Sequence, residues 1–256
     1  MAELLTVERI TKHFGGLTAL LDVSFAVREG QIKALIGPNG AGKTTLFNVV
    51  TGTYGPSDGH VHYGGRMLIG LRPHTIAQLG IGRTFQNINL FNHLTVFDNV
   101  LIGRHARIKT SLWHAALRLP PFRSEEGRAR REAAEILGFM GLADVAGELA
   151  RNLPFGKQRL LETARALATM PKLLLLDEPA SGLAVDEIAE LNAVLRRIRD
   201  RGVTILLVEH NMSLVMDISD EVVVLNFGEK IAEGSPAAVQ ADPAVVDAYL
   251  GKGRAN

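Results

Sequence analysis

A glycine-rich stretch near residue 40 constrains this chain more than any other feature. It follows the pattern G-x-x-x-x-G-K-[ST], after an apolar segment at 32–36 that predicts a buried strand and before residues 44–50, which predict a helix. Glycines let the backbone curl so that its N–H groups point inward, and the helix N-terminus adds positive potential. The stretch therefore predicts a site for phosphate groups. The residues expected to line it are Gly37, Pro38, Asn39, Gly40, Ala41, Gly42, Lys43, Thr44 and Thr45.

Two side chains of this phosphate loop have specific expected roles. Lys43 would reach the β- and γ-phosphates of a nucleoside triphosphate, and the Thr44 hydroxyl would complete a Mg²⁺ shell. The alternative is an ordinary glycine-rich turn between a strand and a helix. Because strand, loop and helix follow one another in the required order, we favour the phosphate site.

Composition limits the other classes of function. The 28 Lys and Arg residues nearly balance the 27 Asp and Glu residues, so charge gives no case for nucleic acid binding. The absence of cysteine excludes disulfides and is compatible with the cytosol. No signal peptide is evident at residues 1–6, and no run of roughly 18 uncharged apolar residues occurs. Any membrane role must therefore go through a partner.

Strands and helices alternate along much of the chain. Residues 4–10 and 23–27 predict strands separated by a turn at 13–16. Leucines 173–176 predict a buried strand, and residues 203–208 predict another. The intervening helical patterns imply a mostly parallel sheet with ligands at the carboxyl ends of its strands.

The sequence pattern changes between residues 87 and 164. Residues 95–98 have the spacing of a helix N-terminal capping arrangement, and Pro120 and Pro121 are expected to break the chain before a helix at 124–140. Nothing strand-like occurs between residues 101 and 153, so we expect an all-helical lobe inserted into an α/β domain.

Basic residues are frequent within this lobe. Eight Lys and Arg residues lie between Arg104 and Arg131, and the only tryptophan, Trp113, lies among them. A basic surface facing a membrane or an acidic partner is one interpretation. We favour a solvated helical face, which is what such runs usually are.

Polar residues follow the predicted strands. Asp177 comes directly after four leucines, where a carboxylate is costly unless it binds a cation directly or through water. Glu178 would polarise an attacking water, and His210 would contact the γ-phosphate or that water. Gln86 could contact Mg²⁺ or the water and report whether the γ-phosphate is present. For each the alternative is a structural role, such as a satisfied histidine at a strand end.

Phe14 precedes the phosphate loop at a spacing that would let an aromatic ring stack on adenine. A phenylalanine that packs in the core or in a turn fits the spacing equally well.

With Lys43, Gln86, Asp177, Glu178 and His210 in this order, the chain resembles the ATPases of ABC transporters over nearly its whole length. The resemblance implies ATP and Mg²⁺ as ligands and an α/β fold. That fold is a RecA-like P-loop NTPase core with a mostly parallel sheet, an N-terminal antiparallel β subdomain and an inserted α-helical subdomain. We expect one ABC ATPase domain over residues 1–256. Residues 1–86 and 165–256 would form its nucleotide-binding core, and residues 87–164 the helical subdomain.

The signature motif of that family would lie at residues 153–158 and departs from Leu-Ser-Gly-Gly-Gln. Pro154 replaces the serine, Phe155 the first glycine and Lys157 the glutamine, while Gly156 remains. The missing hydroxyl removes one bond to the γ-phosphate, which the charge of Lys157 would partly replace. Ala184 likewise stands where the family usually has the last aspartate of the D-loop.

A narrower resemblance is to the branched-chain amino-acid importer ATPases. It rests on residues 82–91, on the signature, and on the ending at 231–251. The resemblance implies a second ATPase subunit, identical or similar, whose signature faces the phosphate loop. It also implies membrane permease subunits that dock on residues 87–91, a solute-binding protein that acts indirectly, and a peripheral position on the cytoplasmic face of the inner membrane.

The sequence leaves the cargo open, because cargo is chosen in the membrane and binding subunits. Urea, short-chain amides or an exported lipid are alternatives to branched-chain amino acids. A soluble ABC ATPase outside transport is disfavoured, because such proteins commonly carry two fused ATPase halves or a long coiled coil and this chain has neither.

Overall fold

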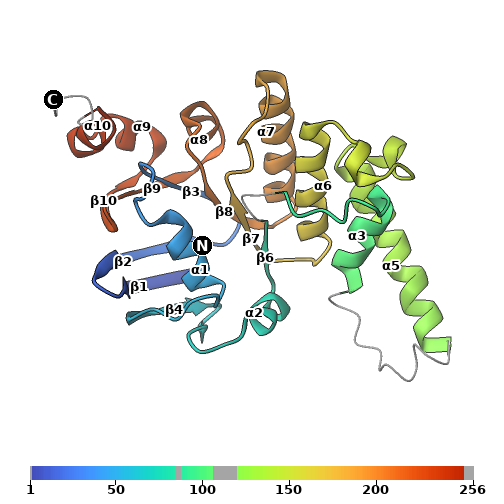
Figure 1. Ribbon diagram of the computed structural model, residues 1–256, viewed down its shortest axis with the longest axis horizontal. Helices are drawn as coiled ribbons and strands as arrows, with labels where there is room; N and C mark the ends of the chain where they lie inside the picture. Colours follow the sequence, from blue (N-terminus) through green and yellow to red (C-terminus); the bar gives the residue numbers. More distant parts are fainter. Residues whose placement is uncertain (1, 85–87, 106–119, 251–256) are drawn as a thin grey trace. The chain divides into compact units, whose positions relative to one another are not determined.

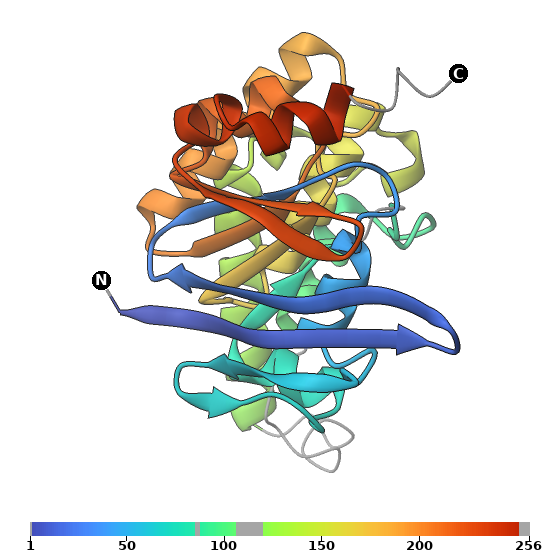
Figure 2. The same cartoon turned by 90° about the vertical axis from the view of Figure 1, so that its left-hand side faces the viewer.

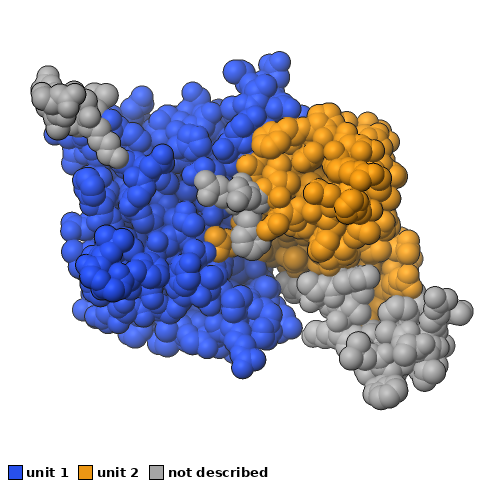
Figure 3. Space-filling view, viewed as in Figure 1, with its two compact units in different colours: residues 1–81, 172–256 blue, residues 82–171 orange. Residues whose placement is uncertain are grey.

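The computed structural model describes residues 2–84, 88–105 and 120–250 of the chain (Figure 1). Two compact units divide it, and Figure 3 shows each in its own colour. Residues 1–81 and 172–256 form what we call the core unit, and residues 82–171 form the helical unit. The predicted insertion at 87–164 falls within the helical unit, whose ends lie several residues beyond it on both sides. The division falls within strand β6 (Ile81–Arg83).

The core unit contains two sheets. An antiparallel sheet has the order β2-β1-β4-β5 and consists of β1 (Glu3–Phe14), β2 (Leu17–Arg28), β4 (Asp58–Tyr63) and β5 (Arg66–Met67). A mixed sheet has the order β10-β9-β3-β8-β7 within this unit and consists of β3 (Ile32–Ile36), β7 (Leu173–Asp177), β8 (Thr204–Val208), β9 (Glu221–Asn226) and β10 (Glu229–Gly234).

The pairing within the mixed sheet confirms the predicted fold class. β3 pairs in parallel with β8 and β9, and β7 pairs in parallel with β8, whereas β9 and β10 form the predicted antiparallel hairpin. Every residue of β3, β7 and β8 is buried, which explains why their sequences are mostly apolar. Parallel strands of this kind bring their carboxyl ends to one edge of the sheet.

The two N-terminal strands are longer than predicted. His13 and Phe14 pair with Thr18 and Leu17, so only Gly15 and Gly16 form the turn. The prediction followed apolar residues, but antiparallel strands with one solvated face continue through polar stretches, and bulges in the ladder interrupt the alternation. Figure 2 shows these strands in blue on one side of the β9–β10 hairpin, with the C-terminal helices in red on the other.

The helices of the core unit cover its sheets. They are α1 (Lys43–Val50), α2 (Pro73–Leu79), α7 (Val185–Asp200), α8 (Met212–Ile218), α9 (Pro236–Gln240) and α10 (Pro243–Leu250). Leu46 and Phe47 of α1 are buried in a hydrophobic core that takes side chains from both sheets, such as Val23 of β2 and Leu206 of β8. The first helix after the phosphate loop is therefore held in place by apolar packing against both sheets.

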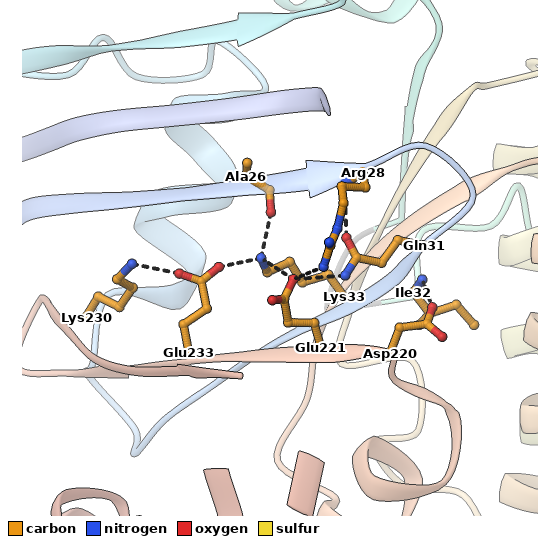
Figure 4. A network of polar contacts seen from close by, with 9 residues as sticks. All are labelled: Ala26, Arg28, Gln31, Ile32, Lys33, Asp220, Glu221, Lys230 and Glu233. Atoms are coloured by element: carbon orange, nitrogen blue, oxygen red, sulfur yellow. Dashed lines mark hydrogen bonds and ion pairs between the residues drawn. The ribbon is translucent and has the colours of Figure 1, made fainter. Parts of the chain in front are cut away.

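One buried charge ties four strands of the core unit together (Figure 4). The Lys33 side chain on β3 is 1% exposed, and its Nζ atom donates to the Ala26 carbonyl at 2.6 Å and to the Glu221 carboxylate at 3.0 Å. It also contacts Glu233, which receives a second bond from Lys230. A buried ammonium is tolerated only when it is paired and hydrogen-bonded, as here. Lys33 is thus a structural link between β2, β3, β9 and β10.

The helical unit contains α3 (Val96–His105), α5 (Pro120–Phe139) and α6 (Phe155–Leu167), with two short 3₁₀ helices at Ala143–Val145 and Ala150–Asn152. As predicted, the Thr95 hydroxyl accepts the Asp98 N–H at 3.0 Å. The expected break at Pro120 and Pro121 is wrong, because α5 begins at Pro120. The first turn of a helix does not use its N–H groups within the helix, so proline starts a helix as readily as it interrupts one.

The described part of the basic region does not form a single solvated face. Arg104 is 9% exposed, pairs with Glu132 and donates to the Ala168 carbonyl at 3.3 Å. Arg128 and Arg130 are exposed and pair with acidic residues one turn away on α5. The expectation of a solvated face therefore fails for Arg104, which packs inside the unit, while Trp113 lies outside the described residues.

Candidate functional site

The phosphate loop connects β3 to α1 through backbone conformations that favour glycine. Gly37, Gly40 and Gly42 have φ angles of 151°, 82° and 101°. A Cβ atom on Gly37 would lie 2.1 Å from the carbonyl oxygen of Leu225 on β9. One on Gly42 would lie 2.7 Å from the carbonyl oxygen of Ala19 on β2. Strands on two sides therefore press against the loop, and glycine is required at both positions.

The side chain of Lys43 turns back into the loop. Its Nζ atom donates to the carbonyl oxygens of Gly37 at 2.7 Å and Pro38 at 3.0 Å, and the residue is 7% exposed. α1 begins at Lys43 with no side-chain cap and no acidic residue in its first turn. The loop thus concentrates an ammonium group and a helix N-terminus at one point, which suits phosphate oxygens. The exposed Thr44 stands beside it in the first turn.

The turn between β9 and β10 braces the loop from outside. The Gly228 N–H donates to the carbonyl oxygen of Ala41 at 3.1 Å, and the Gly228 carbonyl accepts the Leu21 N–H at 2.8 Å. A single residue of the hairpin therefore connects the phosphate loop to β2. The sequence predicted the hairpin but gave no sign of this contact.

Asp177 and Glu178 lie at the carboxyl end of β7. Asp177 is the last residue of the strand and is 2% exposed. Glu178 has a φ angle of 49°, rare for a residue with a side chain, and its N–H donates to the Val208 carbonyl at 2.9 Å. This conformation turns the chain sharply after the strand, so the two carboxylates do not continue the alternation of β7.

His210 follows the neighbouring strand β8 and faces Glu178. Its Nδ1 atom lies 3.7 Å from the Glu178 Oε2 atom. The His210 side chain is 56% exposed and that of Glu178 is 16% exposed. Two residues predicted to act on the same water thus lie together at the edge of the sheet where ligands of such folds bind.

Glu209 is a structural part of this edge for which sequence reasoning assigned no role. It is fully buried, and its Oε1 atom accepts the Ala180 N–H at 2.7 Å. Its Oε2 atom accepts the N–H groups of His210 at 3.1 Å and Asn211 at 3.2 Å. Burial raises the pKa of the Glu209 carboxyl, and these N–H groups oppose the shift. Glu209 therefore joins the loops after β7 and β8; its one signal in the sequence is a carboxylate directly after a buried strand.

Phe14 lies at the end of β1 and is 42% exposed, so it is not a core residue. The Phe14 and Tyr54 rings lie at 82° to each other with centroids 5.4 Å apart, and the Lys12 ammonium lies 5.0 Å from the Phe14 centroid. Phe14 and Tyr54 therefore form a partly exposed aromatic pair at the surface of the core unit.

The signature segment opens α6 in the helical unit. Pro154 is the N-cap residue, and no side chain caps the helix. Phe155 is 44% exposed and stacks on the Arg159 guanidinium at 5.5 Å, Gly156 is buried, and Lys157 lies 3.7 Å from Asp144. The N–H groups of a helix N-terminus thus stand beside a partly exposed lysine, an arrangement that attracts anions.

Ala184 precedes α7 in the core unit. Its N–H donates to the Glu187 carboxylate at 2.9 Å. The helix start is thus capped from within its own first turn. The missing aspartate of the D-loop leaves no gap in this local hydrogen bonding.

The backbone of Phe91, in the segment after Gln86, is held by a side chain of the helical unit. The Asn99 side chain is buried; it accepts the Phe91 N–H at 2.9 Å and donates to the Phe91 carbonyl at 3.1 Å. The Phe91 side chain is 48% exposed, and the Arg165 guanidinium lies 5.5 Å from its ring centroid. The helical unit therefore presents an aromatic side chain on a rigid backbone. Gln86 and Asn87 lie outside the described residues.

Comparison with known proteins places this arrangement in a family. The sequence profile described as ABC transporter matches residues 20–181, and that described as branched-chain amino acid ATP-binding cassette transporter matches residues 229–255. The chain therefore belongs to the ABC transporter family, as an ATP-binding ATPase subunit. This confirms the family and the enzyme class expected from the sequence.

Curated relatives match nearly the whole chain. LivG of Salmonella typhimurium, a high-affinity branched-chain amino acid transport ATP-binding protein, is 45% identical over 97% of this chain and 98% of its own. BraF of Pseudomonas aeruginosa has the same description and is 43% identical over the same shares. A probable LivG of Archaeoglobus fulgidus is 37% identical over 97% of this chain and 96% of its own.

Solved structures confirm the fold. The ADP conformation of MJ1267, an ATP-binding cassette of an ABC transporter, superposes with a TM-score of 0.86 at 33% identity, over 98% of this chain and all of that one. A nucleotide-free cassette from an ABC transporter gives a TM-score of 0.85 with the same identity and coverage. Within the described parts of the present chain, no helix is both long and apolar enough to cross a membrane.

Proposed function

We propose that this chain is the ATP-hydrolysing subunit of a membrane importer for branched-chain amino acids. One observation carries the catalytic half of the proposal: Glu178 and His210 meet at the carboxyl edge of the sheet whose strand β3 enters the phosphate loop. The relatives carry the transport half, because LivG and BraF are described as branched-chain amino acid transport proteins.

Lys43, Thr44 and Asp177 would hold the triphosphate and its metal. The loop suits phosphate because the Lys43 ammonium donates hydrogen bonds to two backbone carbonyl oxygens, and phosphate oxygens can replace these as acceptors. Thr44 offers an exposed hydroxyl at the helix start, and Asp177 offers a buried carboxylate at the end of β7. These are the oxygen donors that Mg²⁺ prefers, so the residues fit the metal. When bound, Mg²⁺ neutralises charge on the phosphates.

Glu178 would polarise the attacking water, and His210 would orient the water or the γ-phosphate. The 3.7 Å separation of their side chains lets both reach one water molecule. Gln86 would contact the metal or the water from the segment that follows β6. Phe14, whose side chain is partly exposed, would stack on the adenine.

The signature segment in the helical unit would complete the site of a second ATPase subunit. We infer that the helical unit is the inserted subdomain of the family. The uncapped start of α6 at Pro154, Phe155 and Gly156, together with Lys157, would contact the γ-phosphate held by the partner copy. That copy is either a second copy of this chain or a similar ATPase.

The segment after Gln86 would bind the permease. Asn99 fixes the Phe91 backbone, and the exposed Phe91 ring can enter an apolar site on a membrane subunit. The chain would then lie on the cytoplasmic face of the inner membrane, held there by permease subunits. A solute-binding protein would deliver the cargo without touching this chain.

Reconstitution tests the proposal. The chain, its cognate permease subunits and its binding protein are placed in liposomes with MgATP, and uptake of radiolabelled leucine, isoleucine and valine is compared with that of urea. We expect uptake of the three amino acids, and none with Glu178→Gln, which should bind ATP but not turn it over. ATP hydrolysis without amino-acid uptake would refute the cargo assignment, and uptake of urea instead would replace it.

A further inference from the structure

The tip of the β9–β10 hairpin lies against the phosphate loop within the core unit. Gly228 is buried there, although Phe227 and Glu229 on either side of it are exposed. Its N–H group donates to the Ala41 carbonyl oxygen at 3.1 Å, and its carbonyl oxygen accepts the Leu21 N–H at 2.8 Å. Both polar backbone groups of Gly228 therefore serve to connect the loop to β2.

Steric contacts keep Gly228 in this position. A Cβ atom on Gly228 would lie 2.8 Å from the Ala19 carbonyl oxygen and 3.2 Å from the Leu20 Cα atom, both on β2. On the side of the loop, a Cβ atom on Gly42 would lie 2.7 Å from the same Ala19 oxygen and 3.6 Å from the Gly228 Cα atom. The hairpin, β2 and the loop thus meet without room for a side chain, so glycine is required at position 228.

The turn that presents Gly228 is strained. Asn226 pairs with Glu229 across the hairpin, so Phe227 and Gly228 form a two-residue turn, with φ angles of 47° and 85°. Glycine, asparagine and aspartate favour such angles, whereas phenylalanine rarely adopts them. Phe227 is 79% exposed, so burial of its side chain does not offset the strain. Strain of this kind persists where surrounding contacts impose it, and the contacts of Gly228 with the loop and β2 are such contacts.

The bond from Gly228 orients one peptide unit of the phosphate loop. The Ala41 carbonyl and the Gly42 N–H belong to the same planar trans peptide, so the two groups point in opposite directions. Because Gly228 holds the carbonyl toward the hairpin, the Gly42 N–H points away from the hairpin. Gly42 is partly exposed, and its N–H makes no hydrogen bond within the parts of the chain that the structure describes. This N–H is therefore oriented in advance for an acceptor from outside the chain.

We propose that Gly228 is a positioning residue for ATP: its N–H holds the Ala41–Gly42 peptide so that the Gly42 N–H donates to a phosphate oxygen. The inference rests on the proposed nucleotide role of the loop. Backbone N–H groups of such loops hold the α- and β-phosphates, so the contact forms with ADP as well as with ATP. The β9–β10 hairpin thereby sets nucleotide affinity although it lies outside the loop pattern.

The test introduces Gly228→Ala into the full-length chain and measures by calorimetry the Kd for MgADP, which is not hydrolysed, and for MgATP. The new Cβ atom forces Gly228 away from β2 and disturbs the bond that its N–H makes to Ala41. We expect both Kd values to rise about tenfold, the effect of one lost hydrogen bond to a charged acceptor. In the assembled transporter the KM for ATP should rise while kcat changes less than about twofold, because the loop holds ground state and transition state alike.

A matched control is Gly202→Ala. Gly202 follows α7 and has the same φ angle of 85°, but a Cβ atom there would meet no atom within 4 Å. The two variants therefore carry the same backbone strain, and only Gly228→Ala disturbs the phosphate loop. We expect Gly202→Ala to lower the melting temperature while leaving both Kd values within about twofold of wild type. Equal changes in Kd for the two variants, or wild-type binding by Gly228→Ala, would overturn the inference.

Hydrogen exchange in the wild-type chain tests the inference without any substitution. Nuclear magnetic resonance of the chain labelled with ¹⁵N-glycine follows the N–H groups of Gly228 and Gly42 separately. We expect the Gly228 N–H to be protected before nucleotide is added, and the Gly42 N–H to become protected when MgADP binds. Fast exchange of the Gly228 N–H in the nucleotide-free chain, or no added protection of the Gly42 N–H, would overturn the inference even if Gly228→Ala does not fold.

Lys43→Ala separates this inference from the proposed function. Loss of nucleotide binding in Lys43→Ala together with wild-type binding in Gly228→Ala would refute only the positioning role. Wild-type binding in Lys43→Ala would instead refute the nucleotide site and the inference with it.

Discussion

Replacing Glu209 by glutamine tests whether this buried carboxylate holds the catalytic edge together. The two carboxylate oxygens accept three backbone N–H groups, those of Ala180, His210 and Asn211. A glutamine amide has a single acceptor oxygen, so in either orientation at least one buried N–H faces the donating NH₂ group. A buried donor without a partner costs about 1–3 kcal/mol, and removing a buried charge offsets part of that.

The expected net loss of unfolding free energy for Glu209→Gln is about 2 kcal/mol, which for a chain of this size lowers the melting temperature by about 4–8 °C. ATP turnover should fall about tenfold, because His210 and the loop after β7 lose their common anchor. ATP binding should not change, because Glu209 has no contact with the phosphate loop among the hydrogen bonds of the described residues. Thermal unfolding, steady-state hydrolysis and ATP titration measure the three quantities.

The raised pKa of Glu209 also predicts how the stability difference between wild type and Glu209→Gln changes with pH. Burial raises the pKa of the Glu209 carboxyl above its ordinary value of 4.5, so the folded state binds this proton more tightly than the unfolded chain. Stability from this group is therefore complete below pH 4.5 and falls as pH rises through the raised pKa. Glutamine does not titrate, so the gap in melting temperature between wild type and Glu209→Gln should narrow as pH rises.

The matched control is Glu229→Gln, which removes the same charge from an exposed position at the start of β10. Exposed substitutions usually change stability by less than about 0.5 kcal/mol, so its melting temperature should stay near that of wild type. Equal shifts for Glu209→Gln and Glu229→Gln, or a gap that widens with rising pH, would refute the reasoning.

Three further predictions concern the loop, the helical unit and the signature. Gly37→Ala forces a Cβ atom against the β9 backbone, so the free energy of unfolding should fall by about 1–3 kcal/mol and ATP affinity should fall with it. An unchanged melting temperature and an unchanged ATP titration would contradict the predicted crowding. Arg104→Met removes the buried partner of Glu132, which keeps the exposed Arg128, and also removes the bond to the Ala168 carbonyl; it should cost about 1–3 kcal/mol, whereas the exposed Arg130→Met should be nearly neutral in the same unfolding assay. Pro154→Ser adds a capping hydroxyl, should stabilise α6 by about 1 kcal/mol and should leave ATPase activity within about twofold. A large gain in turnover for Pro154→Ser would mean that the proline slows hydrolysis.

The parts of the fold that the sequence predicted are those with a local signal. The phosphate loop, its strand and its helix are contiguous, and the leucines at 173–176 mark a strand buried on both faces. Asp177, Glu178 and His210 follow such strands, so the edge at which they lie could be derived from the parallel topology. Their roles remain predictions until the variants are measured.

Two of the errors occur where tertiary contacts override a local sequence pattern. β1 and β2 extend through polar residues because pairing with a neighbouring strand satisfies their backbone. Arg104 lies in a run of basic residues expected on the surface. It is nevertheless buried in the helical unit, where it pairs with Glu132 and donates to the Ala168 carbonyl oxygen. A further error is local: α5 begins at the prolines that were expected to break the chain before it, because proline fits the first turn of a helix.

The braces of the phosphate loop could not have been predicted from the sequence, and they explain why the loop pattern alone does not determine affinity. The Gly228 N–H of the β9–β10 turn donates to the Ala41 carbonyl oxygen, and the Leu225 carbonyl oxygen of β9 lies against the Gly37 Cα atom. Both contacts are made to backbone atoms of the loop, so no change within the loop pattern accompanies their gain or loss. Two ATPases with identical phosphate loops can therefore differ in nucleotide affinity through the β9–β10 hairpin alone.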